Sequence, residues 1–168
     1  RANTAHEFTE EQVIEFLKCK EDPVYFARNY IQIVSLDEGL VPFNMYPFQE
    51  KLIRNFHNER FNICKMPRQT GKSTTCVSYL LHYAVFNDNV NIAILANKAS
   101  TARDLLGRLQ LAYENLPSWM QQGIISWNKG SLELENGSKI LAASPSSSAF
   151  RGGSDNVCFL DEVAFIPI

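Results

Sequence analysis

The sequence predicts an α/β fold in which helices flank a mostly parallel β-sheet. Two nearly unbroken apolar segments, 90–96 (VNIAILA) and 157–160 (VCFL), have the length and composition of strands that are buried on both faces. A third short segment, 61–65 (FNICK), is predicted to be a buried strand that runs directly into a turn. Strands of this kind, separated by helix-length segments, are typical of a parallel sheet covered on both sides.

The composition agrees with a folded chain. Its 168 residues correspond to one domain, or to one domain with a short appendage. Hydrophobic residues make up 45% and charged residues 20%, which excludes disorder as the main state. The net charge of −2 excludes a uniformly basic nucleic-acid-binding coat but not a local basic face. No apolar run is long enough to cross a membrane. The four cysteines form no CxxC pair, so we expect buried free thiols rather than a zinc site or disulfides.

The N-terminal third of the chain is predicted to be mainly helical. Thr9 and Gln12 have the spacing of a capping box, which marks the start of a helix. Asp22-Pro23 supplies an N-cap followed by a proline at the first helical position. Residues 31–41 are rich in β-forming residues without a clear strand boundary. The predicted helices cover 9–20, 23–30 and 47–58, and we expect a helical lead-in subdomain over 1–45 ahead of a core over 46–168.

Beyond residue 65 the predicted elements alternate. Leu105, Leu109 and Ala112 recur at helical spacing and indicate a long helix. Asn136-Gly137 is the dipeptide most typical of a two-residue β-hairpin turn. We interpret this hairpin as an insertion into the parallel plan. The predicted helices are 72–86 and 98–115, and the further predicted strands are 124–127, 131–135 and 138–142.

A candidate phosphate-binding loop lies where the first predicted strand turns into a helix. Gly71-Lys72-Ser73 occupies this position, where backbone amides and a helix N-terminus would face an anion. In such a loop Lys72 neutralises the β- and γ-phosphates, and the Ser73 hydroxyl binds Mg²⁺. The general pattern GxxxxGK[ST] has glycine where this chain has Met66. The motif alone therefore leaves open a plain helix start with an exposed lysine.

Two acids follow the last predicted strand. Asp161 and Glu162 come directly after 157–160, and open α/β sheets bind ligands at the carboxyl ends of their strands. Asp161 is a candidate for the Mg²⁺ shell, and Glu162 for the general base that activates the attacking water. Taken alone, the pair also fits two solvated acids after an edge strand. The loop and the acids together, each after its own strand, predict a site that hydrolyses a nucleoside triphosphate.

Two arginines are candidates for stabilising charge in the transition state. Arg68 lies inside the loop, and Arg151 precedes the flexible pair Gly152-Gly153. A solvated surface position remains the common alternative for either arginine. Other basic residues that could contact nucleic acid are scattered, and solvated faces explain them equally well: Lys51, Arg54, Arg103, Arg108 and Lys129.

A candidate base-binding segment precedes the loop. The Gln49 amide has a donor and an acceptor that match the N6 and N7 edge of adenine. Tyr46 or Phe48 could pack on the base. The alternative, a helix start with its aromatic side chains in the core, is at least as well supported by these residues alone.

Four segments in order carry a resemblance to a known family. MPRQTGKST, ENGSKI, AFRGGSDN and VCFLDEVAFIP resemble the ATPase domain of the large terminase subunit of tailed bacteriophages, in its T-even-type branch. The resemblance covers about residues 22–168. It implies a P-loop NTPase of the additional-strand, catalytic-glutamate type that hydrolyses ATP with Mg²⁺. It also implies a motor that moves double-stranded DNA into a procapsid in the host cytoplasm, and that is not part of the mature virion. The implied partners are the portal protein, the small terminase subunit and further copies in a ring on the portal, with no membrane.

The resemblance assigns roles to individual residues. Lys72 and Arg68 act on the phosphates, and Glu162 is the catalytic glutamate. Arg151 matches an arginine that reaches the ATP of the neighbouring subunit in the ring. The metal ligands are Ser73 and Asp161, and the nucleotide-binding residues are Tyr46, Gln49, Pro67, Arg68, Gln69, Thr70, Gly71, Lys72, Ser73 and Thr74.

Relative to that family we expect a truncated core. The family continues past the Asp-Glu strand with a coupling motif, a later central strand and a C-terminal nuclease, so endonuclease activity is expected only in that missing domain. A helicase-like or remodelling P-loop ATPase that acts on nucleic acid is the alternative enzyme. A P-loop kinase is disfavoured, because phosphoryl transfer to a hydroxyl does not need Glu162 to activate water. A catalytically silent docking module is disfavoured by the intact Lys72, Ser73, Asp161 and Glu162.

Overall fold

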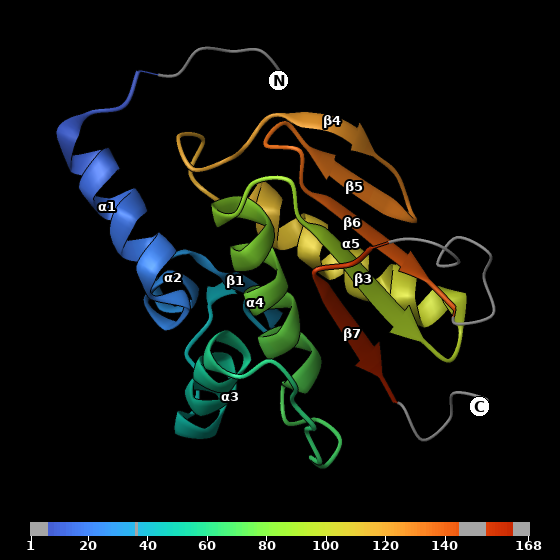
Figure 1. The fold of residues 1–168 in the computed structure, drawn as a ribbon. Helices are drawn as coiled ribbons and strands as arrows, with labels where there is room; N and C mark the ends of the chain where they lie inside the picture. The colour runs from blue at the N-terminus through green and yellow to red at the C-terminus, as the bar shows by residue number, and fades with distance from the viewer. Residues whose placement is uncertain (1–6, 36, 145–153, 163–168) are drawn as a thin grey trace. The chain divides into compact units, whose positions relative to one another are not determined.

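The computed structural model describes residues 7–35, 37–144 and 154–162. The chain forms two compact units. Within the described residues, one unit consists of residues 7–82 and 112–121, and the other of residues 83–111 and 122–162. Each unit has its own arrangement of secondary structure, described in turn below (Figure 1).

The first unit contains the predicted N-terminal helices. Its elements are α1 (Glu10–Glu21), α2 (Pro23–Tyr30), β1 (Gln32–Ser35), β2 (Gly39–Pro42), α3 (Pro47–Asn58) and most of α4 (Lys72–Phe86). The capping box at Thr9 and Gln12 is formed, and the Asp22 carboxylate accepts from the amides of Val24 and Tyr25. These helix starts are confirmed because each depends on hydrogen bonds within one turn.

The segment 31–41, which had no clear boundary in the sequence, forms an antiparallel hairpin. In it β1 pairs with β2, so that Gln32 lies opposite Pro42 and Ser35 opposite Gly39. Gly39 has a positive φ of 74°, which glycine adopts without steric cost at the start of the return strand.

The core of the first unit includes a buried histidine. Phe26 and Ile53 are fully buried, and the ring centroids of Phe26 and His82 lie 5.5 Å apart. His82 Nε2 lies 2.8 Å from the carbonyl oxygen of Cys19. Since a carbonyl oxygen only accepts, Nε2 carries the proton. Burial lowers the pKa of His82 to about 4, so the imidazole is neutral in the fold at physiological pH.

The predicted strand over 61–65 is not formed. Residues 61–67 have no regular secondary structure, and Phe61 and Ile63 are 83% and 100% exposed. A strand persists through hydrogen bonds to a neighbouring strand, and the structure pairs this segment with no strand among the described residues. The prediction was wrong because an apolar run indicates burial only where a partner strand covers it.

The second unit is built on a five-stranded sheet in the order β4-β5-β6-β3-β7. The strands are β3 (Asn91–Ala96), β4 (Ile124–Trp127), β5 (Ser131–Leu134), β6 (Lys139–Ala143) and β7 (Val157–Asp161). Helix α5 (Ala99–Glu114) runs along one face of the sheet (Figure 1). Its inward positions Ala102, Leu105, Leu106 and Leu109 are buried. The strands expected at 90–96, 124–127, 131–135, 138–142 and 157–160 are therefore confirmed to within a residue or so at each end.

The sheet is mixed, which corrects the prediction of a mostly parallel sheet. β3 pairs in parallel with both β6 and β7, but β5 pairs antiparallel with β4 and β6. The predicted hairpin is formed by β5 and β6, and its return strand β6 lies directly beside β3. The apolar side chains of β6 explain this position, since Ile140, Ala142 and Ala143 are all buried.

The hairpin turn is bound to the end of α4. The Asn136 side-chain amide donates to the carbonyl oxygens of Ala84 at 2.9 Å and Asn87 at 3.1 Å. The Ser138 hydroxyl also donates to Asn87 O, at 2.7 Å. These bonds satisfy carbonyl groups that the helix end would otherwise leave unpaired.

Two further expectations concern the cysteines and membranes. Cys19 and Cys76 are buried and form no disulfide with any described residue, as expected, but Cys64 is only half-buried and Cys158 is exposed. Cys158 lies on β7, where alternate side chains face away from the covered face of the sheet. Within the described residues, no helix is both long and apolar enough to cross a membrane.

Candidate nucleotide-binding site

The predicted phosphate loop forms a tight turn directly before α4. Gln69 and Gly71 both have positive φ angles, 62° and 71°, and α4 begins at Lys72. The Thr70 hydroxyl donates to the carbonyl oxygen of Pro67 at 3.0 Å, which closes the turn from within. The left-handed conformation at Gly71 explains the glycine, because a Cβ there is strained.

The first turn of α4 leaves amides available to an anion. The first backbone hydrogen bond of the helix runs from the Thr75 amide to the carbonyl oxygen of Gly71 at 2.9 Å, and the Thr75 hydroxyl donates to the same oxygen. The preceding amides, of Lys72, Ser73 and Thr74, belong to the helix turn that has no intrahelical acceptors. Together with the helix dipole, they provide the local geometry that a phosphate group requires.

Among the described residues of this unit, no ion pair neutralises the charged side chains of the loop. Arg68 is exposed and Lys72 half-buried. The ion pairs described in this unit join other residues: Lys18 to Glu15, Arg28 to Glu50, and Arg54 to Asp22. Two positive charges therefore remain for an anionic ligand at the start of α4.

The base-binding candidates lie beside the loop. Gln49 is 3% exposed, and its side chain accepts from the Tyr46 amide at 2.8 Å and donates to the carbonyl oxygen of Thr70 at 3.1 Å. The Tyr46 and Phe48 rings are stacked with centroids 5.7 Å apart, and they are 64% and 43% exposed. The alternative in which these aromatics belong to the core is therefore wrong. The structure brings Gln49 to the loop, which the sequence could not indicate across 21 residues.

The two acids lie at the carboxyl edge of the second unit's sheet. β7 runs parallel to β3, with Asp161 opposite Ala96, so both strands end at the same edge. Two asparagines fix the start of this pairing: Asn156 Oδ1 accepts from the Asn91 amide at 2.8 Å, and Asn91 Nδ2 donates to Ser154 O at 3.0 Å. Asp161 is 8% exposed, whereas Glu162 is exposed and has a positive φ of 52°. The backbone thus changes conformation directly after Asp161, and the Glu162 side chain is accessible to solvent.

The remaining parts of the predicted site stay predictions. The loop belongs to the first unit and the acids to the second, so their joining into one site is a prediction. Arg151 lies outside the described residues.

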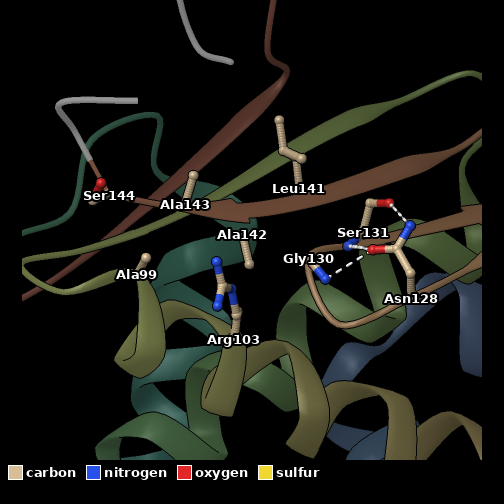
Figure 2. Close-up of a pocket in the computed structure, with 9 residues that line it drawn as sticks. All are labelled: Ala99, Arg103, Asn128, Gly130, Ser131, Leu141, Ala142, Ala143 and Ser144. Atoms are coloured by element: carbon tan, nitrogen blue, oxygen red, sulfur yellow. Dashed lines mark hydrogen bonds between the residues drawn. The ribbon is translucent and has the colours of Figure 1, made fainter. Parts of the chain in front are cut away.

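A hollow that the sequence did not indicate lies on the second unit. A cavity of about 300 Å³ opens between the start of α5, the end of β6 and the β4–β5 turn, and Figure 2 shows Arg103 reaching from α5 toward β6. The turn is shaped by Asn128, whose Oδ1 accepts from the amides of Gly130 and Ser131 at 2.8 Å each. A second cavity of about 340 Å³ is lined by Arg103 and Lys129. Both residues appeared as scattered cations in the sequence, since their proximity depends on tertiary packing.

Comparisons with known proteins agree with this arrangement. The family described as "Terminase large subunit, T4likevirus-type, N-terminal" matches residues 63–168, well over half of the chain. Among solved structures, the chain is similar to the crystal structure of the HK97 bacteriophage large terminase, with a TM-score of 0.67 and 19% identity. That similarity covers 84% of this chain but only 30% of the HK97 chain, and it establishes a shared α/β fold. Because the family model matches residues 63–168, the chain belongs to the T4-like family of terminase large subunits and corresponds to the N-terminal region of that subunit.

Proposed function

We propose that this chain is the ATPase region of a terminase large subunit and that it drives double-stranded DNA into a procapsid. The observation that carries the proposal is the loop at Gly71, which turns directly into α4 and presents free amides beside Lys72. Family membership supplies the link to DNA packaging.

The proposed reaction is the hydrolysis of ATP to ADP and phosphate. The loop from Pro67 to Thr74 binds the phosphates through backbone amides, and Lys72 neutralises charge on the β- and γ-phosphates. Glu162 accepts a proton from water, whose oxygen attacks the γ-phosphorus in line with the leaving ADP oxygen. Arg68 in the same loop, and Arg151 from a neighbouring subunit, stabilise the negative charge that spreads over the transferred group.

The proposed site includes a magnesium ion, which is supported by the chemistry of two residues taken separately. Mg²⁺ prefers hard oxygen ligands, and Ser73 offers a hydroxyl in the first turn of α4 while Asp161 offers a largely buried carboxylate at the end of β7. A buried carboxylate is costly unless a cation or hydrogen bonds compensate it, which supports a metal-binding role for Asp161. When bound, the ion neutralises charge on the β- and γ-phosphate oxygens.

The proposed location and partners of the motor follow from its family. The motor works in the host cytoplasm as a ring on the portal protein and receives DNA together with the small terminase subunit, and it leaves before the virion matures. The hydrogen bond from Gln49 to Thr70 O supports a place for Gln49 beside the nucleotide, and the stacked rings of Tyr46 and Phe48 are proposed to contact the base.

The test uses the full-length protein with the Glu162→Gln substitution. We expect ATP to bind with unchanged affinity while turnover falls by several orders of magnitude, because the variant keeps the shape of the side chain but lacks the base. ATP binding is measured by calorimetry and phosphate release by a coupled assay, with DNA and procapsids present. An unchanged kcat would exclude Glu162 as the catalytic base.

A matched control removes a carboxylate elsewhere on the same sheet. Glu133 on β5 is ion-paired with Lys139 at 3.0 Å and lies on a different strand from the acids of the site. Glu133→Gln should retain wild-type kcat. Wild-type protein that neither binds ATP nor releases phosphate would reject the proposed function as a whole.

A further inference from the structure

We propose that Gln49 is a positioning residue that holds the phosphate loop in its anion-binding conformation, and that it does not read the adenine edge. The proposal rests on the proposed nucleotide-binding function and assigns Gln49 a different part in it. It is carried by the hydrogen bonds and packing of the Gln49 amide within the first unit.

The Gln49 side-chain amide forms two hydrogen bonds within the protein. A glutamine side chain offers one carbonyl oxygen and two N–H groups. Oε1 accepts from the Tyr46 amide at 2.8 Å, and Nε2 donates to Thr70 O at 3.1 Å. With 3% of Gln49 exposed, little of the amide is accessible to a nucleotide base. One N–H group and one lone pair of Oε1 stay outside these two bonds, but burial leaves them little room to reach the edge of a base.

The same amide packs against the glycine of the loop. A Cβ on Gly71 would lie 2.5 Å from Gln49 Nε2, so the side chain occupies the space next to the Gly71 backbone. The contacts on Thr70 and Gly71 are made immediately before the first residue of α4. Gln49 therefore restrains the two residues whose geometry orients the loop amides.

Helix α3, which carries Gln49, is held in place by a buried side chain and by an ion pair to α2. Ile53, one helical turn further along α3, is fully buried, and Glu50 is ion-paired with Arg28 of α2. The Tyr46 amide that binds Oε1 also belongs to the first turn of α3, as its N-cap. Gln49 thus connects a well-packed helix to a loop that has two residues at positive φ.

If Gln49 positions the loop, it affects the binding of the phosphates and not the recognition of the base. The loop conformation favours any triphosphate, so its loss weakens binding with or without a base. The exposed, stacked rings of Tyr46 and Phe48 are then left to contact the base, through stacking rather than through a hydrogen bond to its edge.

The experiment measures the affinity of the full-length protein for ATP, GTP and inorganic tripolyphosphate by calorimetry. In Gln49→Met we expect about a tenfold loss for tripolyphosphate as well as for ATP, the equivalent of one lost hydrogen bond of about 1.4 kcal/mol, with the ATP-to-GTP ratio unchanged. Tyr46→Ala is the matched comparison, and it should weaken ATP while leaving tripolyphosphate unchanged. A Gln49→Met protein that loses ATP affinity but keeps tripolyphosphate affinity would overturn the proposal.

A second measurement needs no ligand. The apolar side chain of Gln49→Met suits this buried position and has no donor for Thr70 O, so the contact to the loop is lost without burying a charge. Hydrogen exchange in peptides covering 66–75 should become faster in this variant, with circular dichroism unchanged. Unchanged exchange would contradict the positioning role. Wild-type protein that binds neither ATP nor tripolyphosphate would instead reject the proposed function.

Discussion

Both the backbone conformation and the packing of a neighbouring side chain require glycine at position 71. Its φ of 71° disfavours any residue with a Cβ, at a cost of about 1–2 kcal/mol. A Cβ would also displace the Gln49 amide. We expect Gly71→Ala to lower the free energy of unfolding by about 1–2 kcal/mol and to abolish measurable ATP binding, as checked by denaturant titration and calorimetry.

Gly39 provides the control for this substitution. It has nearly the same φ, 74°, but no heavy atom lies within 4 Å of the position of its Cβ. Gly39→Ala should therefore lose a similar amount of stability and bind ATP normally. Equal ATP affinities in the two variants would show that the contact between Gly71 and Gln49 is unimportant.

At the scale of elements, the buried histidine makes the stability of the first unit depend on pH. The pKa of His82 is about 4 in the fold, chiefly because of burial, and 6.5 in the unfolded chain. Between these values the unfolded chain binds the additional proton, so stability is full above pH 6.5 and falls as the pH drops toward 4. The difference corresponds to at most about 3 kcal/mol.

The measurement compares wild-type protein with His82→Gln. A glutamine amide can still donate to Cys19 O but does not titrate, so the variant should lose less stability between pH 7 and pH 5 in denaturant titrations. Parallel pH profiles for the two proteins would contradict this assignment.

In the second unit, the Asn136 side chain of the hairpin turn is expected to stabilise the fold by binding the end of α4. Asn136→Ala leaves the carbonyl oxygens of Ala84 and Asn87 without this donor, and we expect a loss of about 1–3 kcal/mol in unfolding free energy. Asn29→Ala removes one exposed bond to Tyr25 O and should cost less than about 0.5 kcal/mol. Similar losses in the two variants would show that Asn136 does not hold the helix end.

At the scale of the whole molecule, the proposed ring places part of each site on its neighbour. We expect Arg151→Ala to lose DNA-stimulated ATP hydrolysis only in the assembled ring, because the arginine is proposed to act on the ATP of the adjacent subunit. The measurement is phosphate release by the full-length variant with portal-bearing procapsids and DNA, and without them. Full activity of the variant ring would refute the role in trans.

Most elements could be predicted because their signals are local. A capping box, an Asp-Pro start and an Asn-Gly turn each fix a few neighbouring residues through short-range hydrogen bonds and steric restrictions. The site residues could be proposed for the same reason, since Gly71-Lys72-Ser73 and Asp161-Glu162 are short motifs at element ends. The helix starts, the loop at the start of α4 and the strand before the acids accordingly agree with the structure.

The neighbours of each strand and the hydrogen-bond partners of Gln49 could not be predicted from the sequence. Phe61 and Ile63 looked like strand residues, yet they are exposed because no strand of the described chain pairs with theirs. The hairpin was predicted, but not the position of its return strand β6 directly beside β3. The hydrogen bonds of the Gln49 amide to Tyr46 and Thr70 could not be predicted either, because the partner in the loop lies 21 residues away in the sequence.

The sequence by itself determined the family, the helices and the positions of the phosphate loop and the two acids. The tertiary structure decided the mixed strand order, the unpaired segment over 61–65 and the contact between α3 and the loop. The physical reason is the range of the interactions. Caps and turns are fixed by residues three or four positions apart, whereas strand neighbours and buried amide partners depend on which distant segments come together on folding.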